Sequence, residues 1–234
     1  MSLYLAVELC TLTIPLLFSF DRKVAYYRKW AFLFPAMLVT AGVFILIDIH
    51  FTSMKVWGFN PAYHSRFIIA GLPLEEILFF IIIPYCSMFI HYVFITYLPG
   101  AGLKSMHTTI IAIILIIMLL IMSSVFSRMI YTRFYSLLTA AVIIFTIVFN
   151  SHLLSRYFIT FLIILVPFII VNGILTGSLI KGTVFWYDES EISGIRLLTI
   201  PVEDFLFGFS LILSNLLLAE FIRTHIIKRN ADKS

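Results

Sequence analysis

Long, uninterrupted apolar runs constrain the fold of this chain more than any other feature of its sequence. The 234 residues are 62% hydrophobic and only 12% charged, and the mean hydropathy is +1.08. Such a composition is typical of membrane proteins, and only helices and closed barrels satisfy their backbone hydrogen bonds in lipid. The runs are continuous rather than alternating, which favours helices over barrel strands. The sequence therefore predicts an all-α polytopic membrane protein.

Seven apolar segments can be drawn, most of them close to the ~20 residues that a spanning helix needs. They cover residues 2–20, 31–51, 67–97, 106–127, 134–150, 157–180 and 197–222. The first lacks a basic stretch before it and a small-residue cleavage site after it, so we expect a retained helix rather than a signal peptide. The third is too long for one straight span. We expect it to break or bend at Gly71–Pro73, because proline cannot continue the helical ladder.

Positive residues are distributed unevenly between the two sides of these spans. One side carries ten Lys and Arg residues and the other carries six. The ten are Arg22, Lys23, Arg28, Lys29, Lys104, Arg156, Arg223, Lys228, Arg229 and Lys233. The positive-inside rule therefore predicts a cell-membrane protein with its C-terminus in the cytoplasm and its N-terminus outside.

An acidic motif occurs twice, each time near the start of an apolar segment. Residues 71–80 are GLPLEEILFF and residues 199–208 are TIPVEDFLFG, at a constant offset of 128 residues. Proline and acids in a first helical turn are ordinary N-terminal chemistry, because acids favour the positive end of the helix dipole. The duplication, however, favours a functional role for these acids, since carboxylates are costly in hydrocarbon. If the last helix starts near Leu197, Glu203 lies about 9 Å further into the membrane at ~1.5 Å per residue.

The duplication extends upstream of the acids. Pro35 and a loop with Trp57 precede the first motif, while Pro167 and a loop with Trp186 precede the second. We therefore predict two three-helix repeats, residues 1–100 and 134–234, joined by a connector helix in residues 101–133. An even number of helices separates the motifs, so the repeats are parallel. They are expected to pack about a pseudo-two-fold axis along the membrane normal, with the third and seventh helices lining one cavity.

These features resemble the membrane-integral, non-flavin lycopene cyclases, which occur as heterodimers of two small three-helix subunits and as fusions of both. The resemblance covers nearly the whole chain and is to the fused form. It implies conversion of the linear ψ-ends of lycopene into β-ionone rings, giving γ-carotene and β-carotene. Carried over residue by residue, the acid motifs of the family fall on Glu75, Glu76, Glu203 and Asp204.

Ring closure of this kind is redox-neutral and needs an acid, a base and walls that exclude water. A carboxyl in an apolar pocket can stay protonated near neutral pH, and each aromatic face stabilises a cation by ~0.5–2 kcal/mol. Adjacent helical residues point in different directions, so a partner of Glu75 or Glu76 is expected on another helix, for example from the other repeat. We expect Glu75→Gln and Glu203→Gln each to lower cyclisation by at least ~100-fold.

Further candidate residues surround the acids. The candidates for substrate binding are Trp57, Phe79, Phe80, Asn172, Trp186, Phe205 and Phe207. Asp48, deep in the second segment, could be an additional acid or the buried partner of a polar side chain. Asn172 would equally suit a helix–helix hydrogen bond. For Tyr63 and Tyr187 the favoured interpretation is an aromatic belt at the membrane interface.

Several functional classes lack support in the sequence. No G-x-G-x-x-G fingerprint follows a strand, and the histidines lack metal-ligand spacing, so we expect neither a cofactor nor a metal site. The net charge of +4 is low for a nucleic-acid binder. The expected partners are a lipid-soluble carotenoid, membrane lipids and other carotenoid-pathway enzymes.

Two other functions remain open. A proton-coupled transporter would also combine repeats with intramembrane acids, and it predicts acids near the midplane with access from both faces. A non-catalytic carotenoid-binding subunit is the second alternative. A cyclase instead predicts an apolar cavity that opens sideways to lipid. The sequence leaves open whether one or both substrate ends are cyclised and which carboxyl donates the proton.

Overall fold

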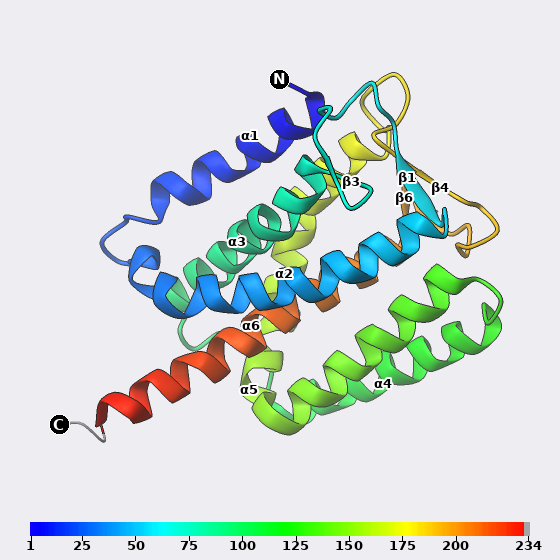
Figure 1. Ribbon diagram of the computed structural model, residues 1–234. Helices are drawn as coiled ribbons and strands as arrows, with labels where there is room; N and C mark the ends of the chain where they lie inside the picture. The colour runs from blue at the N-terminus through cyan, green and yellow to red at the C-terminus, as the bar shows by residue number, and fades with distance from the viewer. Residues whose placement is uncertain (232–234) are drawn as a thin grey trace.

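The computed structural model describes residues 1–231, so Lys233 and the last residues of the predicted second repeat lie outside the described part. The elements in chain order are α1 (Leu3–Phe18), the 3-10 helix η1 (Tyr26–Lys29), α2 (Trp30–Ser53), β1 (Trp57–Phe59), β2 (Ile68–Ile69), β3 (Leu72–Pro73), α3 (Leu74–Tyr97), α4 (Ser105–Val125), α5 (Ile130–Leu175), β4 (Phe185–Tyr187), β5 (Arg196–Leu197), β6 (Ile200–Pro201) and α6 (Val202–Ala231). The strands and their loops gather at one end of the helical bundle (Figure 1).

The helices confirm a helical membrane protein. Among the described residues, five helices are long and apolar enough to cross a membrane: Tyr26–Ser53, Leu74–Tyr97, Ser105–Val125, Ile130–Leu175 and Val202–Lys228. With 16 residues, α1 is apolar but shorter. Seven spans in two parallel repeats therefore remain a prediction.

Buried and exposed apolar residues separate as expected for a bundle in lipid. Fully buried side chains from α2, α3, α5 and α6 form the main core, including Leu33, Met37, Met88, Leu154 and Leu213. On α4, by contrast, many large apolar side chains are exposed, among them Ile110, Ile113, Ile114, Ile117 and Ile121. Because hydrocarbon replaces water as the solvent there, these exposed side chains suit contact with lipid.

The longest helix, α5, is divided into two arms at Asn150. The backbone of Asn150 is non-helical, with φ −156° and ψ 71°, and its Oδ1 accepts a hydrogen bond from the backbone N–H of Leu153 at 3.0 Å. This is the geometry of an N-cap, in which a side-chain oxygen satisfies a free N–H of the following helix. Figure 1 shows the first arm packed beside α4 and the second arm turning back into the bundle.

We expect Asn150→Ala to lower the free energy of unfolding by about 1 kcal/mol, because it removes this cap. Asn150→Asp, which keeps a capping oxygen, should retain the parent stability. Thermal unfolding in detergent, followed by circular dichroism, measures both. Equal stability of Asn150→Ala and the parent would show that the cap does not support the second arm.

The two acid motifs are preceded by β-hairpins rather than by continuous helix. Ile68 pairs with Pro73 in β2–β3, and Arg196 pairs with Pro201 in β5–β6. The predicted break at Gly71–Pro73 is confirmed, because α3 begins at Leu74. The residues before it are not helical as expected: they form a hairpin with a tight turn at Ala70 and Gly71, whose φ angles are 52° and 89°. Left-handed backbone of this kind favours glycine and ends a helix.

The same correction applies to the last helix. It begins at Val202, not near Leu197, because Leu197 and Leu198 form the second hairpin and its turn. Glu203 consequently lies in the first helical turn, not about 9 Å beyond the helix start.

Candidate active site

Three carboxyl groups from three helices line one small cavity of about 50 Å³. They belong to Asp48 on α2, Glu76 on α3 and Asp204 on α6, and all three side chains are buried. One acid from each motif therefore lies on the same cavity. The remaining wall residues are aromatic except for one amide: Trp57, Phe59, Phe79, Phe80, Tyr131, Phe168, Asn172, Phe185, Tyr187 and Phe207. We call this space the acid cavity.

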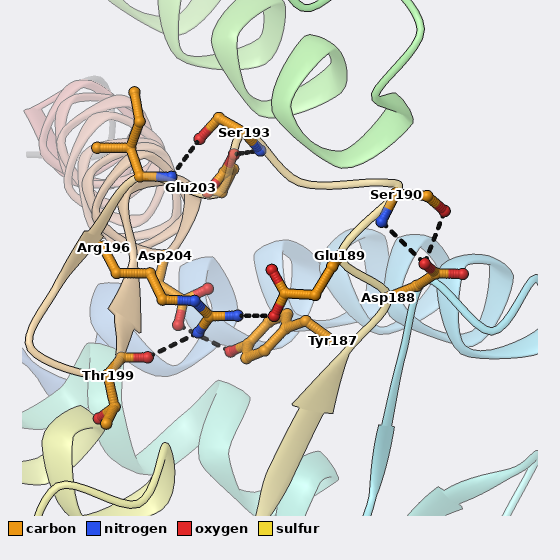
Figure 2. A network of polar contacts seen from close by, with 10 residues as sticks. Tyr187, Asp188, Glu189, Ser190, Ser193, Arg196, Thr199, Glu203 and Asp204 are labelled. Carbon is orange, nitrogen blue, oxygen red and sulfur yellow. Dashed lines mark hydrogen bonds and ion pairs between the residues drawn. The ribbon is translucent and has the colours of Figure 1, made fainter.

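Asp204 is held by three hydrogen-bond donors. The hydroxyl of Tyr131 donates to Oδ1 at 2.9 Å, while Nδ2 of Asn172 and the hydroxyl of Tyr187 each donate to Oδ2 at 2.8 Å. Removal from water and the nearby Asp204 carboxyl raise the pKa of Tyr187, whose hydroxyl therefore stays a donor. Figure 2 shows Tyr187 reaching Asp204 from the end of β4. Three donors are an arrangement that suits a carboxylate, since each bond favours the charged form.

Glu76 and Asp48 have fewer partners. The hydroxyl of Tyr4, on α1, donates to Oε2 of Glu76 at 2.8 Å. Nε1 of Trp57 donates to Oδ1 of Asp48 at 2.8 Å, while Oδ2 of Asp48 has no hydrogen-bond partner among the described residues. Asp48 is therefore the buried partner of a polar side chain and also lines the acid cavity.

Glu75 and Glu203 point away from the acid cavity and bind the loops before their hairpins. The backbone N–H of Ser65 donates to Oε1 of Glu75 at 2.6 Å, and that of Ser193 donates to Oε1 of Glu203 at 2.7 Å. Each glutamate also accepts from a hydroxyl, that of Ser65 at 2.9 Å for Glu75 and that of Thr132 for Glu203. The first acid of each motif thus fastens a hairpin to the start of its helix.

The hairpins themselves are built alike. The N–H of Leu74 donates to the carbonyl of Phe67, and the N–H of Val202 donates to that of Ile195, both at 2.9 Å. The strands β1 and β4, which lie in the loops before the hairpins, pair with each other, with Gly58 opposite Trp186. This pairing joins the two loops that close the acid cavity on one side.

The predicted substrate-binding residues divide into two groups. Trp57, Phe79, Phe80, Asn172 and Phe207 line the acid cavity, but Trp186 and Phe205 do not. Trp186 is 43% exposed and covers Gly58 on the outer side of the strand pair.

Phe205 packs on the ring of Phe168, with ring centroids 5.1 Å apart. The two tryptophans are not equivalent in the strand register, because Trp57 pairs with Tyr187 rather than with Trp186. Trp57 precedes Pro73 by 16 residues and Trp186 precedes Pro201 by 15. This difference of one residue puts the two tryptophans in different surroundings.

Sequence reasoning missed the tyrosines that bind the acids. Tyr4 and Tyr131 each lie in the first turn of a helix and each donate to the second acid of a motif. Their separation of 127 residues, close to the motif offset of 128, is the signal that could have revealed them. The aromatic-belt interpretation of Tyr187 is replaced by its bond to Asp204, and the hydroxyl of Tyr63 donates to the carbonyl of Lys181.

A larger apolar cavity of about 330 Å³ adjoins the acid cavity. Its walls include Cys10 and Ile14 from α1, Ile83 and Cys86 from α3, and Ile164 and Ile170 from α5. Phe79, Phe168 and Asn172 line both cavities. We call this space the lateral groove.

The lateral groove opens on the side of the bundle. Two of its wall residues are largely exposed, Ile14 at 64% and Ile170 at 55%. In a membrane protein an exposed apolar surface of this kind faces lipid. The groove therefore brings an apolar, lipid-facing surface next to the acid cavity, with which it shares three wall residues.

The family is shown by comparison with known proteins. A family model described as lycopene cyclase matches residues 1–94 and 128–222. This chain belongs to the lycopene cyclase family. The matched residues include both acid motifs and both hairpins, and they leave out α4. No curated protein and no solved structure matches the chain.

Membership of the lycopene cyclase family gives the chain a carotenoid cyclase role. The site has features that suit such a role, namely buried carboxyls, aromatic walls and an apolar approach. Within the described residues, no group of three or more His, Cys, Asp or Glu side chains is placed to hold a metal ion.

Proposed function

We propose that this protein is a lycopene β-cyclase, an isomerase that closes the ψ-ends of lycopene into β-ionone rings and forms γ-carotene and then β-carotene. The observation that carries the proposal is the junction between the lateral groove and the acid cavity at Phe79, Phe168 and Asn172. A long apolar substrate in the bilayer could enter the groove sideways and place one end against the carboxyls. The polyene would remain in the groove and in lipid.

The proposed reaction needs only groups that line the acid cavity. A protonated carboxyl adds its proton to the terminal double bond, and the neighbouring double bond attacks the resulting cation to close the ring. A carboxylate then removes a ring proton, so no electrons are gained or lost. Phe79, Phe80 and Phe207 line the space where the cation would form, and aromatic faces stabilise cations by ~0.5–2 kcal/mol each.

We assign the four motif acids to two tasks. Glu76 and Asp204 would act on the substrate, because both line the acid cavity. Glu75 and Glu203 would position them, because they tie the hairpins to the starts of α3 and α6. Asp48 would be an additional acid of the site, held by Trp57.

The matched contacts of the two motifs support a fused protein with two repeats, residues 1–100 and 134–234, joined by a connector in residues 101–133. We further propose that it lies in the cell membrane with its N-terminus outside and its C-terminus in the cytoplasm. Its carotenoid substrate would reach it through membrane lipids. Other enzymes of the carotenoid pathway would act on the same pool of substrate.

The function is tested by expressing the protein in a lycopene-producing host and separating the pigments by chromatography. We expect lycopene to be replaced by monocyclic and bicyclic carotenoids with β-rings, without consumption of a redox cofactor. Unchanged lycopene together with proton-driven solute uptake would support a transporter instead. Lycopene that copurifies with the protein but is never converted would support a carotenoid-binding subunit.

A further inference from the structure

Glu8 on α1 is a buried acid that the proposed reaction does not yet use. Its side chain is 1% exposed, and neither carboxyl oxygen has a hydrogen-bond partner among the described residues. A buried carboxyl without partners is unusual, because burying a polar group costs free energy unless it is hydrogen-bonded. Glu8 is therefore a candidate for a role in the reaction.

The position of Glu8 connects it with Glu76. It lies four residues after Tyr4 on α1, so the two side chains share one face of the helix. Tyr4 is fully buried and its hydroxyl donates to Oε2 of Glu76. Glu8 also lies close enough to Glu75 and Glu76 to interact with them electrostatically.

Among the side chains that the structure describes, no basic group pairs with Glu8. The two ion pairs found among the described residues are Arg196–Glu189 and Arg223–Glu220, and neither involves the acids of the cavity. An ionised carboxylate buried without a partner is costly. Glu8 is therefore best accommodated as the neutral acid, which can donate one hydrogen bond.

The surroundings of Asp204 are different. It receives three hydrogen bonds, from Tyr131, Asn172 and Tyr187. Four residues after Tyr131, at the place that corresponds to Glu8 after Tyr4, stands Tyr135 rather than an acid. Glu76 thus has a second buried carboxyl on the helix that supplies its hydrogen-bond donor Tyr4. Asp204 instead has three donors, which suit a carboxylate.

From this asymmetry we propose that Glu76 is the proton donor of the cyclase, that Glu8 is a positioning residue that stabilises the Glu76 carboxylate as it forms, and that Asp204 is the base. Asp48, which is held by Trp57 and also lines the acid cavity, stays an additional acid beside them. This inference rests on the proposed cyclase function and assigns roles within the same site. It also accounts for how a buried carboxyl can protonate an alkene, because a neutral acid beside the developing carboxylate lowers the cost of its charge.

The proposed steps balance. Glu76 gives its proton to the terminal double bond and becomes a carboxylate, to which Glu8 donates a hydrogen bond while keeping its own proton. The ring carbon–carbon bond forms, and Asp204 takes a proton from the carbon beside the cation. One proton enters the substrate and one leaves it, so the proton must return from Asp204 to Glu76 before the next ring closes.

The role of Glu8 is tested by Glu8→Leu, Glu8→Gln and Glu8→Asp in membranes supplied with lycopene. We expect Glu8→Leu to lower kcat by about 100-fold, the low end of what one hydrogen-bond donor to a developing oxyanion contributes. Glu8→Gln should keep most of the rate, because its amide NH₂ can still donate the hydrogen bond. KM should stay unchanged, because Glu8 does not line the lateral groove. Glu8→Asp should restore part of the rate, and Tm in detergent should not fall for Leu, since an unpartnered carboxyl is removed.

Glu220→Gln on α6 is the matched control, because Glu220 pairs with Arg223 away from the acid cavity. Its rate should equal that of the parent. A parent-like rate for Glu8→Leu, or an equal loss in Glu8→Leu and Glu8→Gln, would overturn the hydrogen-bonding role of Glu8 while leaving the cyclase function intact. Failure of the parent to convert lycopene would instead remove the proposed function itself.

Reactions in D₂O distinguish the proposed base, Asp204, from Glu8, which assists the proposed donor. Without its base, the cyclic cation loses a proton from a different neighbouring carbon, which moves the ring double bond, or it reverts to lycopene that carries deuterium. We expect Asp204→Asn to show displaced rings or deuterated lycopene, and Glu8→Leu to form only β-rings, slowly. If Asp204→Asn shows neither, or if displaced rings arise from Glu8→Leu, the assignment of roles is wrong.

Discussion

Glu76→Gln and Asp204→Asn should each lower cyclisation by about 10²–10⁴-fold, the range that a positioned general acid or base contributes. Both carboxyls line the acid cavity, and no other residue of the two motifs brings a carboxyl to it. The amides keep the size of the side chains and can still accept the hydrogen bonds from Tyr4 and Tyr131. Both variants lose the ability to give up or take up a proton. Asp204→Asn also loses an oxygen that accepts from Asn172 and Tyr187, or from Tyr131, so its folding has to be checked.

The measurement is the initial rate of ring formation in membranes, with Tm in detergent as a check on folding. Glu75→Gln and Glu203→Gln are the informative comparison, because these side chains bind Ser65 and Ser193 instead of lining the cavity. The sequence alone predicts at least ~100-fold losses for them as well. Parent-like activity of Glu76→Gln together with inactive, stable Glu75→Gln would reverse the division between reacting and positioning acids.

Two tryptophans introduced at the mouth of the lateral groove should also lower the rate of cyclisation strongly. We expect the double variant Ile14→Trp with Ile170→Trp to lower kcat/KM by about 100-fold, the scale expected when a substrate is displaced by ~1 Å from its productive position. Both side chains line the groove, one from α1 and one from α5. Both are largely exposed, so the larger rings do not have to fit a packed core.

The control is Leu17→Trp with Leu162→Trp. These residues lie on the same two helices and are 68% and 65% exposed, but they do not line the groove. This control should cyclise lycopene at the parent rate. Equal activity of the two double variants would show that the substrate reaches the acids by another route.

The local composition of the sequence was sufficient to predict the apolar helices and the acid motifs. Continuous apolar runs predicted the helices, since a backbone in lipid must satisfy its own hydrogen bonds. The repeated motif indicated Glu75, Glu76, Glu203 and Asp204, because acids in hydrocarbon are too costly to be accidental. These four residues and the apolar runs are also what made the family recognisable.

Other parts of the site were out of reach of sequence patterns. The hairpins before α3 and α6 have strands of only two residues, and apart from Arg196 these residues are as apolar as the helices they precede. The similar spacing of Trp57 and Trp186 suggested equivalent places, but the pairing of β1 with β4 buries one and exposes the other.

The sequence by itself determined that this is a helical membrane protein with paired acids at the starts of two helices. Only the tertiary structure decided which acid of each pair meets the cavity, because adjacent helical side chains point about 100° apart and the rotation of each helix is set by packing. Glu76 and Asp204 were turned inward, and Glu75 and Glu203 toward the hairpins. The contact of Tyr4 with Glu76 and the burial of Glu8 arise likewise from the packing of α1 on α3, across more than 60 residues of chain.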